Sequence, residues 1–434
     1  MMFKSKGVCV PDFLLPRDGI SHEAWAVIAC DQFTQDRSYW DAVEAFVGDN
    51  PSALRIVLPE IDLADTDLRV PQIQQTMRMY RDEVLTKRVH GFALVRRETE
   101  TMTRRGLLAT IDLEKYDYSE GSTSMIRPTE GTIVARLPPR VKVRLGACIE
   151  SPHVLVLLDD PECTVVEPLF ERTDSLETLY DFDLMMGGGH IRGWAVSAEE
   201  DLEAIDRALS AIASDEIQRA RYGDAYTGDP LLFAVGDGNH SLATARACWE
   251  NIKATLSETE RETHPARFAM VEIGNLHDPG LVFEPIHRVL FGVDPTDALK
   301  SLAQYLEDHK GEGGHQKLRA FHGKSEVSVH TATAPHRLPV GSLQGWIDAY
   351  LAEHPGVEVD YIHGDAEAVA LAKGAEALAF LLEGMDKNEL FASVLQEGAL
   401  PRKTFSIGEA RDKRYYLECR AIEPEARENG QGEQ

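Results

Sequence analysis

The sequence predicts an α+β fold with mixed sheets and interleaved helices. Short apolar runs with strand character alternate with longer helical patterns, but no strict strand–helix–strand repeat runs through the chain. This irregular order favours an α+β fold over a doubly wound parallel sheet. The 434 residues suffice for two domains or one elaborated domain, because single hydrophobic cores rarely grow beyond about 250–300 residues.

The individual elements follow from the apolar patterns in chain order. We expect residues 1–122 to form an N-terminal α/β segment, and residues 123–420 to form a core that packs with it as one unit. Residues 421–434 are charged and poor in apolar side chains, which predicts a solvated tail. The expected strands lie at 27–30, 55–60, 91–98, 105–118, 154–158, 231–235, 267–274, 280–290 and 413–422, and the expected helices at 38–48, 72–89, 198–223, 242–252, 299–309, 375–384 and 387–398.

The composition argues against two classes of partner. A net charge of −27 argues against nucleic acid or an anionic membrane bound through bulk electrostatics. The six cysteines include no C-x-x-C pair, which is typical of reduced thiols in the cytosol. The sequence shows no signal peptide and no apolar stretch of membrane-spanning length, so we expect a cytoplasmic location. No pattern in the sequence sets the oligomeric state.

The turn GDGNHS at residues 236–241 is the most informative stretch. It follows the apolar run 231–235 and precedes a pattern in which Leu242, Ala245 and Trp249 share one helical face. A strand, a glycine turn and a helix in succession expose N–H groups at the positive end of the helix dipole, where anions bind. The candidate residues of this turn are Asp237, Gly238, Asn239, His240 and Ser241.

Two interpretations of this turn compete. Asp237, Asn239 and Ser241 are all good N-cap residues, and helix capping alone would explain one of them. Capping would not explain Gly238 between two polar residues, or His240 beside them. In the second interpretation the turn binds an anion, and Asp237 holds a metal ion or accepts a proton. The stretch lacks the G-x-x-x-x-G-K-[ST] pattern of a Walker A loop.

A second candidate region spans residues 124–144. Pro128 and Gly131 predict a turn, and Arg140, Lys142 and Arg144 form a local basic patch in an otherwise acidic chain. Such a patch suits phosphate recognition, whereas the alternative is a surface strand with an ordinary mix of charges. The candidate residues beside this turn are Arg127, Thr129, Glu130 and Thr132.

Three further stretches place polar residues beside glycine or proline. The run GGG at 187–189 permits close backbone approach to a ligand, or else forms a flexible linker. The stretch 272–290 lacks the spacing of a metal site, so we expect none there; its strand end is better placed to face a ligand. The basic turn at 400–405 would contact phosphate, although such turns are usually surface. The candidate residues of these stretches are His190, Arg192, His287, Arg288, Lys403 and Thr404.

Several stretches together resemble a bacterial and archaeal family known as domain of unknown function 1015. In order, they are IRPTEGT (126–132), SPHVLVLLDDPE (151–162), GDGNHSLATA (236–245), HDPGLVFEPIHRVL (277–290) and LPRKTF (400–405). The resemblance covers residues from about 10 to 420. Many members of the family carry D-G-H-H-R at the turn, which is similar to a turn in the ParB/sulfiredoxin-like superfamily. Members of that superfamily bind nucleotides and include a kinase that acts on free serine.

The resemblance implies a ParB/sulfiredoxin-like core elaborated by additional α/β segments, with a site for nucleotide-dependent phosphoryl transfer. Asp237 would be a base or a metal-holding group near the transferred phosphoryl. Glu130 would orient or deprotonate a substrate hydroxyl, and His240 would face the phosphates with the Gly238 backbone. The implied cofactor is ATP or ADP with Mg²⁺.

The chain departs from the family pattern at three positions of these motifs. Asn239 and Thr129 stand where many members have histidine, and Ser241 stands where they have an arginine. Losing that arginine removes a bidentate phosphate donor. Arg288 and Lys403 are candidates to supply the missing charge.

Three functions therefore stay open from the sequence. The first is a phosphotransferase that acts on a small, serine-like hydroxyl compound. The second is a non-catalytic regulatory protein that binds a small molecule or a nucleotide in an inherited pocket. The third is a hydrolase or lyase with His240 or His287 as general acid or base.

Overall fold

The computed structural model describes residues 6–134 and 137–424, and the chain divides into two compact units. Unit 1 is Met1–Leu281 together with Ala410–Gln434, and unit 2 is Val282–Glu409. Each unit has its own sheet and its own apolar core.

This division differs from the predicted segments 1–122 and 123–420. Strands from both sides of residue 122 pair within one sheet of unit 1, so no boundary between units lies there. The predicted tail begins with a residue of a short strand, Arg420–Ala421, and its residues 425–434 lie outside the described residues.

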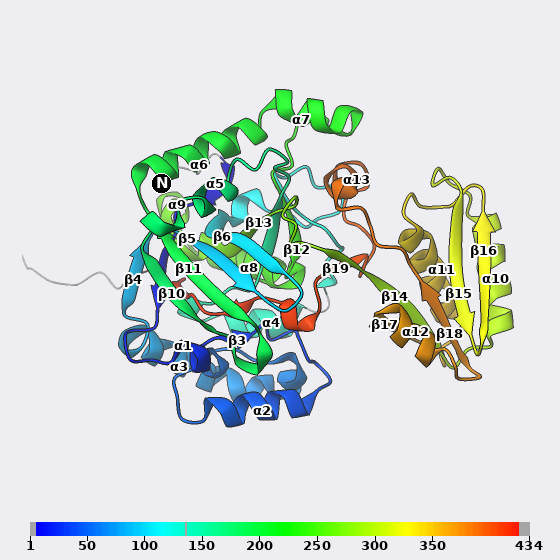
Figure 1. The fold of residues 1–434 in the computed structure, drawn as a ribbon, viewed down its shortest axis with the longest axis horizontal. Helices are drawn as coiled ribbons and strands as arrows, with labels where there is room; N and C mark the ends of the chain where they lie inside the picture. The colour runs from blue at the N-terminus through cyan, green and yellow to red at the C-terminus, as the bar shows by residue number, and fades with distance from the viewer. Residues whose placement is uncertain (1–5, 135–136, 425–434) are drawn as a thin grey trace, which may run out of the picture. The chain divides into compact units, whose positions relative to one another are not determined.

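Unit 1 is built on a mixed sheet with the order β10-β11-β5-β6-β13-β9-β12-β7 and with β1 beside β6 (Figure 1). Along this order the β13–β9 and β12–β7 pairs are parallel and the other neighbours are antiparallel. The predicted α+β fold with mixed sheets is confirmed. The strands are β1 (Val8–Cys9), β5 (Phe92–Glu98), β6 (Thr103–Asp112), β7 (Ile126–Pro128), β9 (Leu155–Leu158), β10 (Thr178–Asp183), β11 (His190–Val196), β12 (Phe233–Asp237) and β13 (Phe268–Asn275).

Helices cover both faces of this sheet. Successive strand residues point to opposite faces, so Val95 packs in one apolar core and Leu94 in the other. In Figure 1, α2 and α6 lie on opposite sides of the sheet, and α8 packs in the same core as α6 through Leu242 and Trp249. The helices of unit 1 are α1 (His22–Trp25), α2 (Arg37–Val47), α3 (Thr66–Glu83), α4 (Leu137–Arg144), α5 (Glu167–Phe170), α6 (Glu199–Ile212), α7 (Asp215–Tyr222), α8 (Asn239–Lys253) and α9 (Glu258–Thr263).

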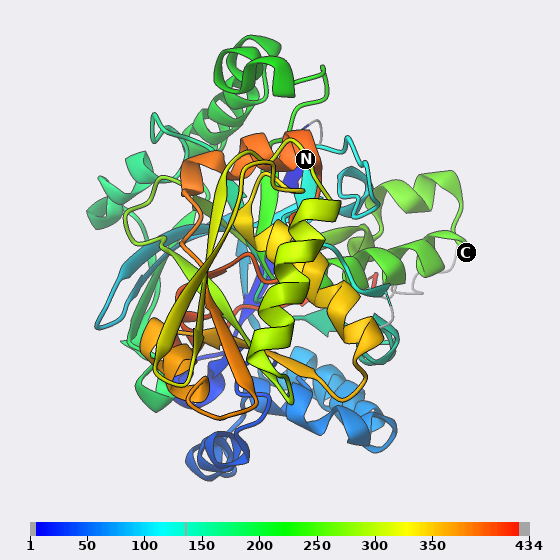
Figure 2. The same cartoon turned by 90° about the vertical axis from the view of Figure 1, so that its right-hand side faces the viewer.

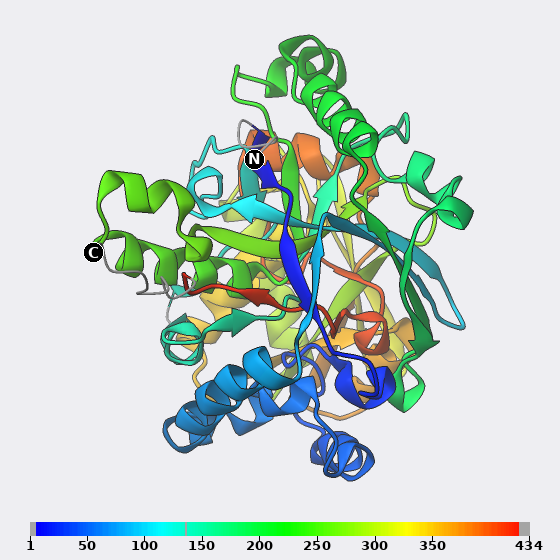
Figure 3. The same cartoon turned by 90° about the vertical axis from the view of Figure 1, so that its left-hand side faces the viewer.

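Buried charges fix the C-terminal segment 410–422 within unit 1 (Figure 3). Arg414 donates to the carboxylates of Glu272 and Glu418 at 2.8 Å each, and all three side chains are at most 5% exposed. Arg97 donates to three main-chain carbonyls of the same segment. Short antiparallel pairs join further segments, namely β2 (Asp12–Leu15) with β4 (Lys87–His90), β3 (Val27–Ile28) with β20 (Tyr415–Tyr416), and β8 (Ile149–Glu150) with β21 (Arg420–Ala421).

Unit 2 contains an antiparallel sheet with the order β16-β15-β18-β14-β17 and with β19 beside β14 (Figure 2). Helices α10 and α11 cover one face through Leu302 and Trp346, and α12 covers the other through Ala368. The elements are β14 (Phe283–Phe291), α10 (Pro295–Asp308), β15 (Gln316–His322), β16 (Ser325–Thr331), α11 (Pro339–Glu353), β17 (Glu358–His363), α12 (Asp365–Leu371), β18 (Ala377–Leu381), α13 (Leu390–Glu397) and β19 (Phe405–Ile407).

The helix expected at residues 375–384 is wrong, because this segment contains strand β18. The strand expected at residues 55–60 is also wrong. The segment begins in a short 3₁₀ helix, Ala53–Arg55, which is capped by the Ser52 side chain. Ile56 and Leu58 nevertheless pack in the core of unit 1. Their burial explains the apolar pattern, which a buried irregular segment shares with a strand.

Candidate functional site

The turn between β12 and α8 has a backbone that requires glycine. Gly238 is the N-cap of α8 and has left-handed dihedral angles, with φ 81° and ψ 26°. A Cβ atom at this position would lie 3.0 Å from Val154 Cγ2 and 3.1 Å from Val154 Cα. Both the conformation and the close approach of Val154 therefore exclude larger residues.

The N-cap of α8 is Gly238, which makes no side-chain capping hydrogen bond, so none of the three candidate caps occupies the N-cap position. Two of the candidate caps bond elsewhere: Asn239 Nδ2 donates to the Val235 carbonyl at 3.3 Å, and Ser241 Oγ lies 3.2 Å from His153 Nε2. The N–H groups of the first turn of a helix have no partner within the helix. The N-terminus of α8, a helix of 15 residues, therefore has the dipole and the donors that bind an anion.

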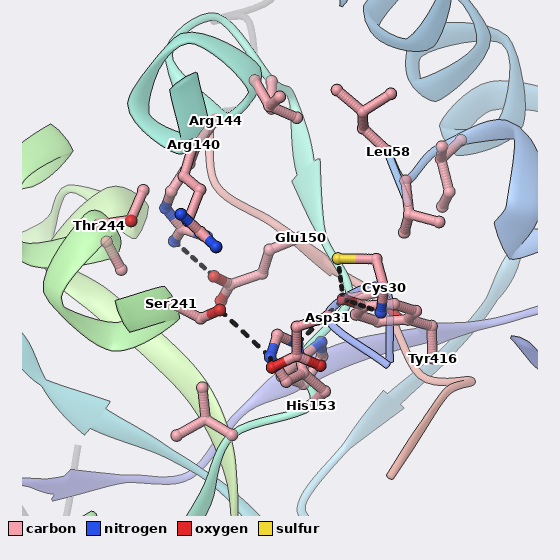
Figure 4. Close-up of a pocket in the computed structure, with 18 of the residues that line it drawn as sticks. Cys30, Asp31, Leu58, Arg140, Arg144, Glu150, His153, Ser241, Thr244 and Tyr416 are labelled. Atoms are coloured by element: carbon pink, nitrogen blue, oxygen red, sulfur yellow. Dashed lines mark hydrogen bonds and ion pairs between the residues drawn. The ribbon is translucent and has the colours of Figure 1, made fainter. Parts of the chain in front are cut away.

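His153 stands at the centre of the polar groups beside this turn (Figure 4). Its side chain is 7% exposed, and its Nε2 atom lies 3.7 Å from Asp31 Oδ2 in addition to the contact with Ser241. Its Nδ1 atom lies 3.0 Å from the hydroxyl of Tyr416. This differs from a Ser–His–Asp triad, in which the serine and the acid contact different ring nitrogens.

Nearby acids favour the charged form of this histidine. Burial is the largest single effect and lowers the pKa of His153, but Asp31, Asp237 and Glu60 together outweigh it. The pKa of His153 is therefore raised above its ordinary value. Burial likewise disfavours ionised Asp31, but His153 and Lys413 outweigh it and lower the pKa of that carboxyl. Each partner therefore favours the charged form of the other.

Lys413 links this pair to the acid of the turn. Its Nζ atom lies 3.4 Å from Asp237 Oδ2, and its charge also lowers the pKa of Asp31. Two acids, Asp31 and Asp237, and two cations, His153 and Lys413, therefore form one cluster with balanced charge. A cluster of this kind offers cations to a phosphate and carboxylates to a metal ion or a hydroxyl proton.

Cys30 and Tyr416 are neutral members of the same cluster. The Tyr416 hydroxyl lies 2.9 Å from Cys30 Sγ. Burial, with the Asp31 charge, raises the pKa of Cys30 to about 12, and burial also raises the pKa of Tyr416. Because a thiolate is the nucleophilic form of cysteine, Cys30 is not a nucleophile at neutral pH.

A cavity of about 180 Å³ opens beside His153 and the first turns of α8. A single water needs about 10–15 Å³ by this measure, so the space suits a small organic molecule. One side of the cavity carries the polar groups Asp31, His153 and Ser241, and ion pairs join Arg140 to Glu60 and Arg144 to Glu150. The apolar lining comprises Ile56, Val57, Leu58, Leu63, Met77, Val143, Ala147, Ile149, Val154, Leu242, Ala245, Ala269 and Met270.

The predicted residues around Glu130 lie at the same edge of the sheet as Asp237. Strand β7 runs parallel to β12 with Pro128 opposite Val235, so the residues that follow both strands emerge together. The Thr129 hydroxyl donates to the Val235 carbonyl at 2.6 Å. The topology thus brings the loop of Glu130 beside the turn of Asp237.

Two more predicted residues on this side of the sheet differ in their surroundings. The Thr132 hydroxyl is buried and has no hydrogen-bond partner. The backbone N–H of the next residue, Ile133, donates to His240 Nε2 at an N–N distance of 3.4 Å. Arg127 is buried in β7 and donates to the carbonyls of Ser124 and Asp229. Burial lowers the pKa of Arg127, and its bonds are to the backbone of its own surroundings.

His190 and Arg192 lie apart from the turn. They belong to β11, which is next to the β10 edge of the sheet, whereas β12 is next to the β7 edge. His190 lies 2.7 Å from Asp183 and 2.7 Å from Asp181, and these two acids raise its pKa. The structure therefore does not bring this predicted pair to the cluster around His153.

The remaining predicted residues, His287, Arg288, Lys403 and Thr404, belong to unit 2. His287 is buried, with Nδ1 accepting from the Leu382 N–H at 3.2 Å and Nε2 lying 2.9 Å from Asp365 Oδ1. Arg288 donates to the carbonyls of Ile286 and Arg402. Thr404 donates to the Pro401 carbonyl at 2.6 Å, and Lys403 has a left-handed backbone with φ 57°. Nowhere in the described chain do three or more His, Cys, Asp or Glu side chains gather as a metal site.

Sequence reasoning missed Asp31, His153, Lys413 and Tyr416. Asp31 follows the predicted strand 27–30, and His153 precedes the apolar run 154–158. Polar residues at strand ends were therefore the available signal. Lys413 and Tyr416 carry no such signal, because the buried bonds of Arg414 bring them to the site.

A family model confirms the recognition made from the motifs. The model described as "Protein of unknown function (DUF1015)" matches residues 14–354. The chain belongs to this family. The matched range includes the turn 236–241 and the stretch that carries His153, and the comparison with curated proteins found no match.

Among solved structures, this chain is similar to three proteins at low identity. A free serine kinase in complex with AMP is 11% identical, with 74% of this chain and 93% of that chain covered and a TM-score of 0.38. SbnI from Staphylococcus aureus, with a C-terminal truncation, is 12% identical, with 69% and 82% covered and a TM-score of 0.34. A conserved hypothetical protein from Pyrococcus furiosus is 12% identical, with 73% and 95% covered and a TM-score of 0.36.

Proposed function

We propose that unit 1 is a nucleotide-dependent phosphotransferase that acts on a small hydroxyl compound. The observation that carries the proposal is the glycine N-cap of α8 beside the buried His153, whose charged form the Asp31 carboxylate favours. Phosphoryl transfer requires little more than positioned donors, positive charge on the phosphates and an acid near the hydroxyl. The cluster supplies each of these groups next to a cavity of molecular size.

The phosphates bind where the positive groups gather. The first N–H groups of α8, with the Gly238 backbone and His240, hold the phosphates of ATP or ADP. His153 and Lys413 supply charge that the turn itself lacks, because Ser241 stands where many family members carry an arginine. Ser241 contacts the basic side chain of His153, so a basic group still lies next to this position of the turn.

The acids take the remaining roles. Glu130 orients the substrate hydroxyl and accepts its proton while the hydroxyl oxygen bonds to phosphorus. The bond between phosphorus and the leaving nucleotide oxygen breaks in the same displacement. Asp237 stands next to the transferred phosphoryl, and Asp31 maintains the charge of His153.

Mg²⁺ fits this cluster only together with the nucleotide. The described residues hold no group of three acidic or histidine ligands, but Mg²⁺ commonly binds through one or two carboxylates and substrate phosphates. Asp237 and Asp31 are the carboxylates that would hold it. The bound ion would neutralise charge on the phosphates.

A second function, ligand binding without turnover, is favoured by one contact. The ion pair of Asp237 with Lys413 engages the carboxylate that would act near the phosphoryl group. If this pair persists when nucleotide binds, the site retains a ligand and transfers nothing.

We further propose a cytoplasmic protein whose partner is a small molecule and not nucleic acid or a membrane. The net charge of −27 supports this proposal. Among the helices that the structure describes, none has the length and apolar character needed to cross a membrane.

The test combines binding with product detection. ATP, ADP and pyrophosphate, each with and without Mg²⁺, are added to the pure protein and the unfolding temperature is measured. The protein is then incubated with ATP and a mixed pool of hydroxyl metabolites, and phosphorylated products are identified by mass spectrometry. Asp237→Asn and Glu130→Gln should each slow transfer by about 10²–10⁴-fold, whereas Glu203→Gln on the exposed side of α6 should not.

The outcomes separate the two functions. Stabilisation by nucleotide together with a phosphorylated product supports the phosphotransferase. If nucleotide raises the unfolding temperature of both the parent chain and Glu130→Gln, and no product forms, the result supports ligand binding alone. If none of the phosphate compounds changes the unfolding temperature, both are overturned.

A further inference from the structure

The cavity beside His153 extends beyond the polar groups that would hold a hydroxyl. We propose that the substrate of unit 1 is a small hydroxyl compound with an apolar arm, in contrast to a compound as polar as serine. This inference rests on the phosphotransferase proposed above and names the class of compound that accepts the phosphoryl group.

One wall of the cavity consists of buried apolar side chains that belong to one core of unit 1. Leu58, Met77, Ile149 and Met270 are exposed by only 4%, 6%, 1% and 1%. They come from separate elements, since Met77 lies on α3, Ile149 on β8 and Met270 on β13. Figure 4 shows Leu58 on the side of the cavity away from Ser241 and His153. A substrate whose hydroxyl lies at the turn of Asp237 therefore extends its other end past Ser241 and His153 towards this wall.

The charged groups on the cavity are paired with one another. Glu150 accepts from Arg420 Nε at 2.9 Å and from the Met270 N–H at 3.0 Å, and it also pairs with Arg144. Arg140 pairs with Glu60 in the same way. An ionic arm would have to displace one of these pairs and leave a partly buried charge without a partner. An apolar arm leaves both pairs in place.

An apolar arm also gains binding from the wall itself. Side chains that face an empty space lose dispersion contacts, and a ligand arm restores them. Each methylene that moves from water to this wall should tighten binding about fourfold. Serine has no carbon atoms beyond its hydroxymethyl and backbone groups, so it gains nothing from this part of the cavity.

The experiment measures binding of a neutral series without nucleotide. Ethane-1,2-diol, butane-1,2-diol and hexane-1,2-diol carry the same two hydroxyls and differ only in the apolar arm. Their affinities for the full chain are measured by isothermal titration calorimetry. The affinity should rise about 16-fold from ethane-1,2-diol to butane-1,2-diol, which is about fourfold for each of two added methylenes. Val143→Phe, which fills the apolar side, should abolish this rise.

The control changes a neighbouring residue outside the cavity. Leu145 follows α4 and is 46% exposed, so Leu145→Phe should keep the rise. A rise in the parent chain and in Leu145→Phe that is lost in Val143→Phe supports the apolar arm. Equal affinities across the series, or a rise that Val143→Phe retains, overturns it. Because nucleotide is absent, failure of this test differs from failure of the phosphotransferase, which shows as lack of nucleotide binding or product.

Discussion

The turn of unit 1 and the basic residues of unit 2 are made of similar residue types but differ in what those residues contact. In unit 1, His153 faces charged partners and a cavity, and no described side chain caps the helix that begins at the turn. In unit 2, Arg288 and Thr404 donate to main-chain carbonyls close by, and His287 accepts from a main-chain N–H. His287 also lies beside an acid, Asp365, but burial outweighs that acid and lowers the pKa of His287. The sequence motifs indicated both regions as sites.

This difference distinguishes polar residues that stabilise the fold from polar residues that can bind a ligand. A buried arginine that donates to carbonyls satisfies the backbone and holds a fold together. A buried histidine kept charged by an acid, beside open space, has charge to offer a ligand. The variants below test this distinction between the two units, from the largest expected effect to the smallest.

The largest effect on stability is expected at Arg414 in unit 1. Arg414→Met leaves the buried carboxylates of Glu272 and Glu418 without their shared partner, and breaking such a buried pair costs about 3–5 kcal/mol of unfolding free energy. Arg288→Met in unit 2 removes donors from carbonyls, which costs about 1–3 kcal/mol. Urea unfolding followed by hydrogen exchange in each unit measures both losses.

The same two variants also show, through pyrophosphate binding, which unit contains the binding site. Arg414→Met should weaken pyrophosphate binding, because Arg414 fixes the segment that carries Lys413 and Tyr416. Arg288→Met should leave pyrophosphate binding unchanged. Equal losses of binding in the two variants would contradict the assignment of the site to unit 1.

A smaller effect is expected at two glycines with positive φ angles. Gly238 in unit 1 has φ 81° and Gly398 in unit 2 has φ 79°. Alanine at either position should cost about 1–2 kcal/mol of unfolding free energy, because left-handed backbone is strained for L-residues. A Cβ at Gly398 meets no atom within 4 Å, whereas one at Gly238 meets Val154. Gly238→Ala should therefore also weaken pyrophosphate binding in calorimetry, and Gly398→Ala should not; matched losses of affinity would argue against an anion site at the turn.

The smallest expected effect comes from the charge of His153, which can be changed without disrupting the fold. The raised pKa of His153 means that its charge stabilises the folded chain below the ordinary pKa, and that this contribution is lost as pH rises through the raised value. Pyrophosphate binding should weaken over the same range. In Asp31→Asn, burial prevails and the pKa of His153 falls below its ordinary value, so binding weakens already near neutral pH.

A matched control for this test exists at the other edge of the sheet. Asp181 helps to raise the pKa of His190, so Asp181→Asn should lower the pKa of His190 without changing pyrophosphate binding. The pKa values of both histidines are measured by NMR titration of their imidazole carbons. An unchanged His153 titration in Asp31→Asn would contradict the pairing of these residues.

The sequence was sufficient for the fold class and for part of the site. The strands flanking Asp237 and the helix after it followed from apolar periodicity, which depends only on neighbouring residues. His153, Asp31 and Lys413 were missed because they come from segments more than 80 residues apart in sequence, which long-range strand pairing and the buried bonds of Arg414 bring together. The apolar run 55–60 was taken for a strand because burial of Ile56 and Leu58 does not require regular structure.

The most direct test of the central claim is hydrogen exchange of the full chain with and without ADP and Mg²⁺, read by mass spectrometry. The N–H groups of Asn239, His240 and Ser241 are expected to become protected when the nucleotide binds, because they donate to its phosphates. The N–H groups of Lys403 and Thr404 in unit 2 are expected to exchange as before. Protection at Lys403 and Thr404, with none at residues 239–241, would contradict the claim that the turn of unit 1 is the nucleotide site.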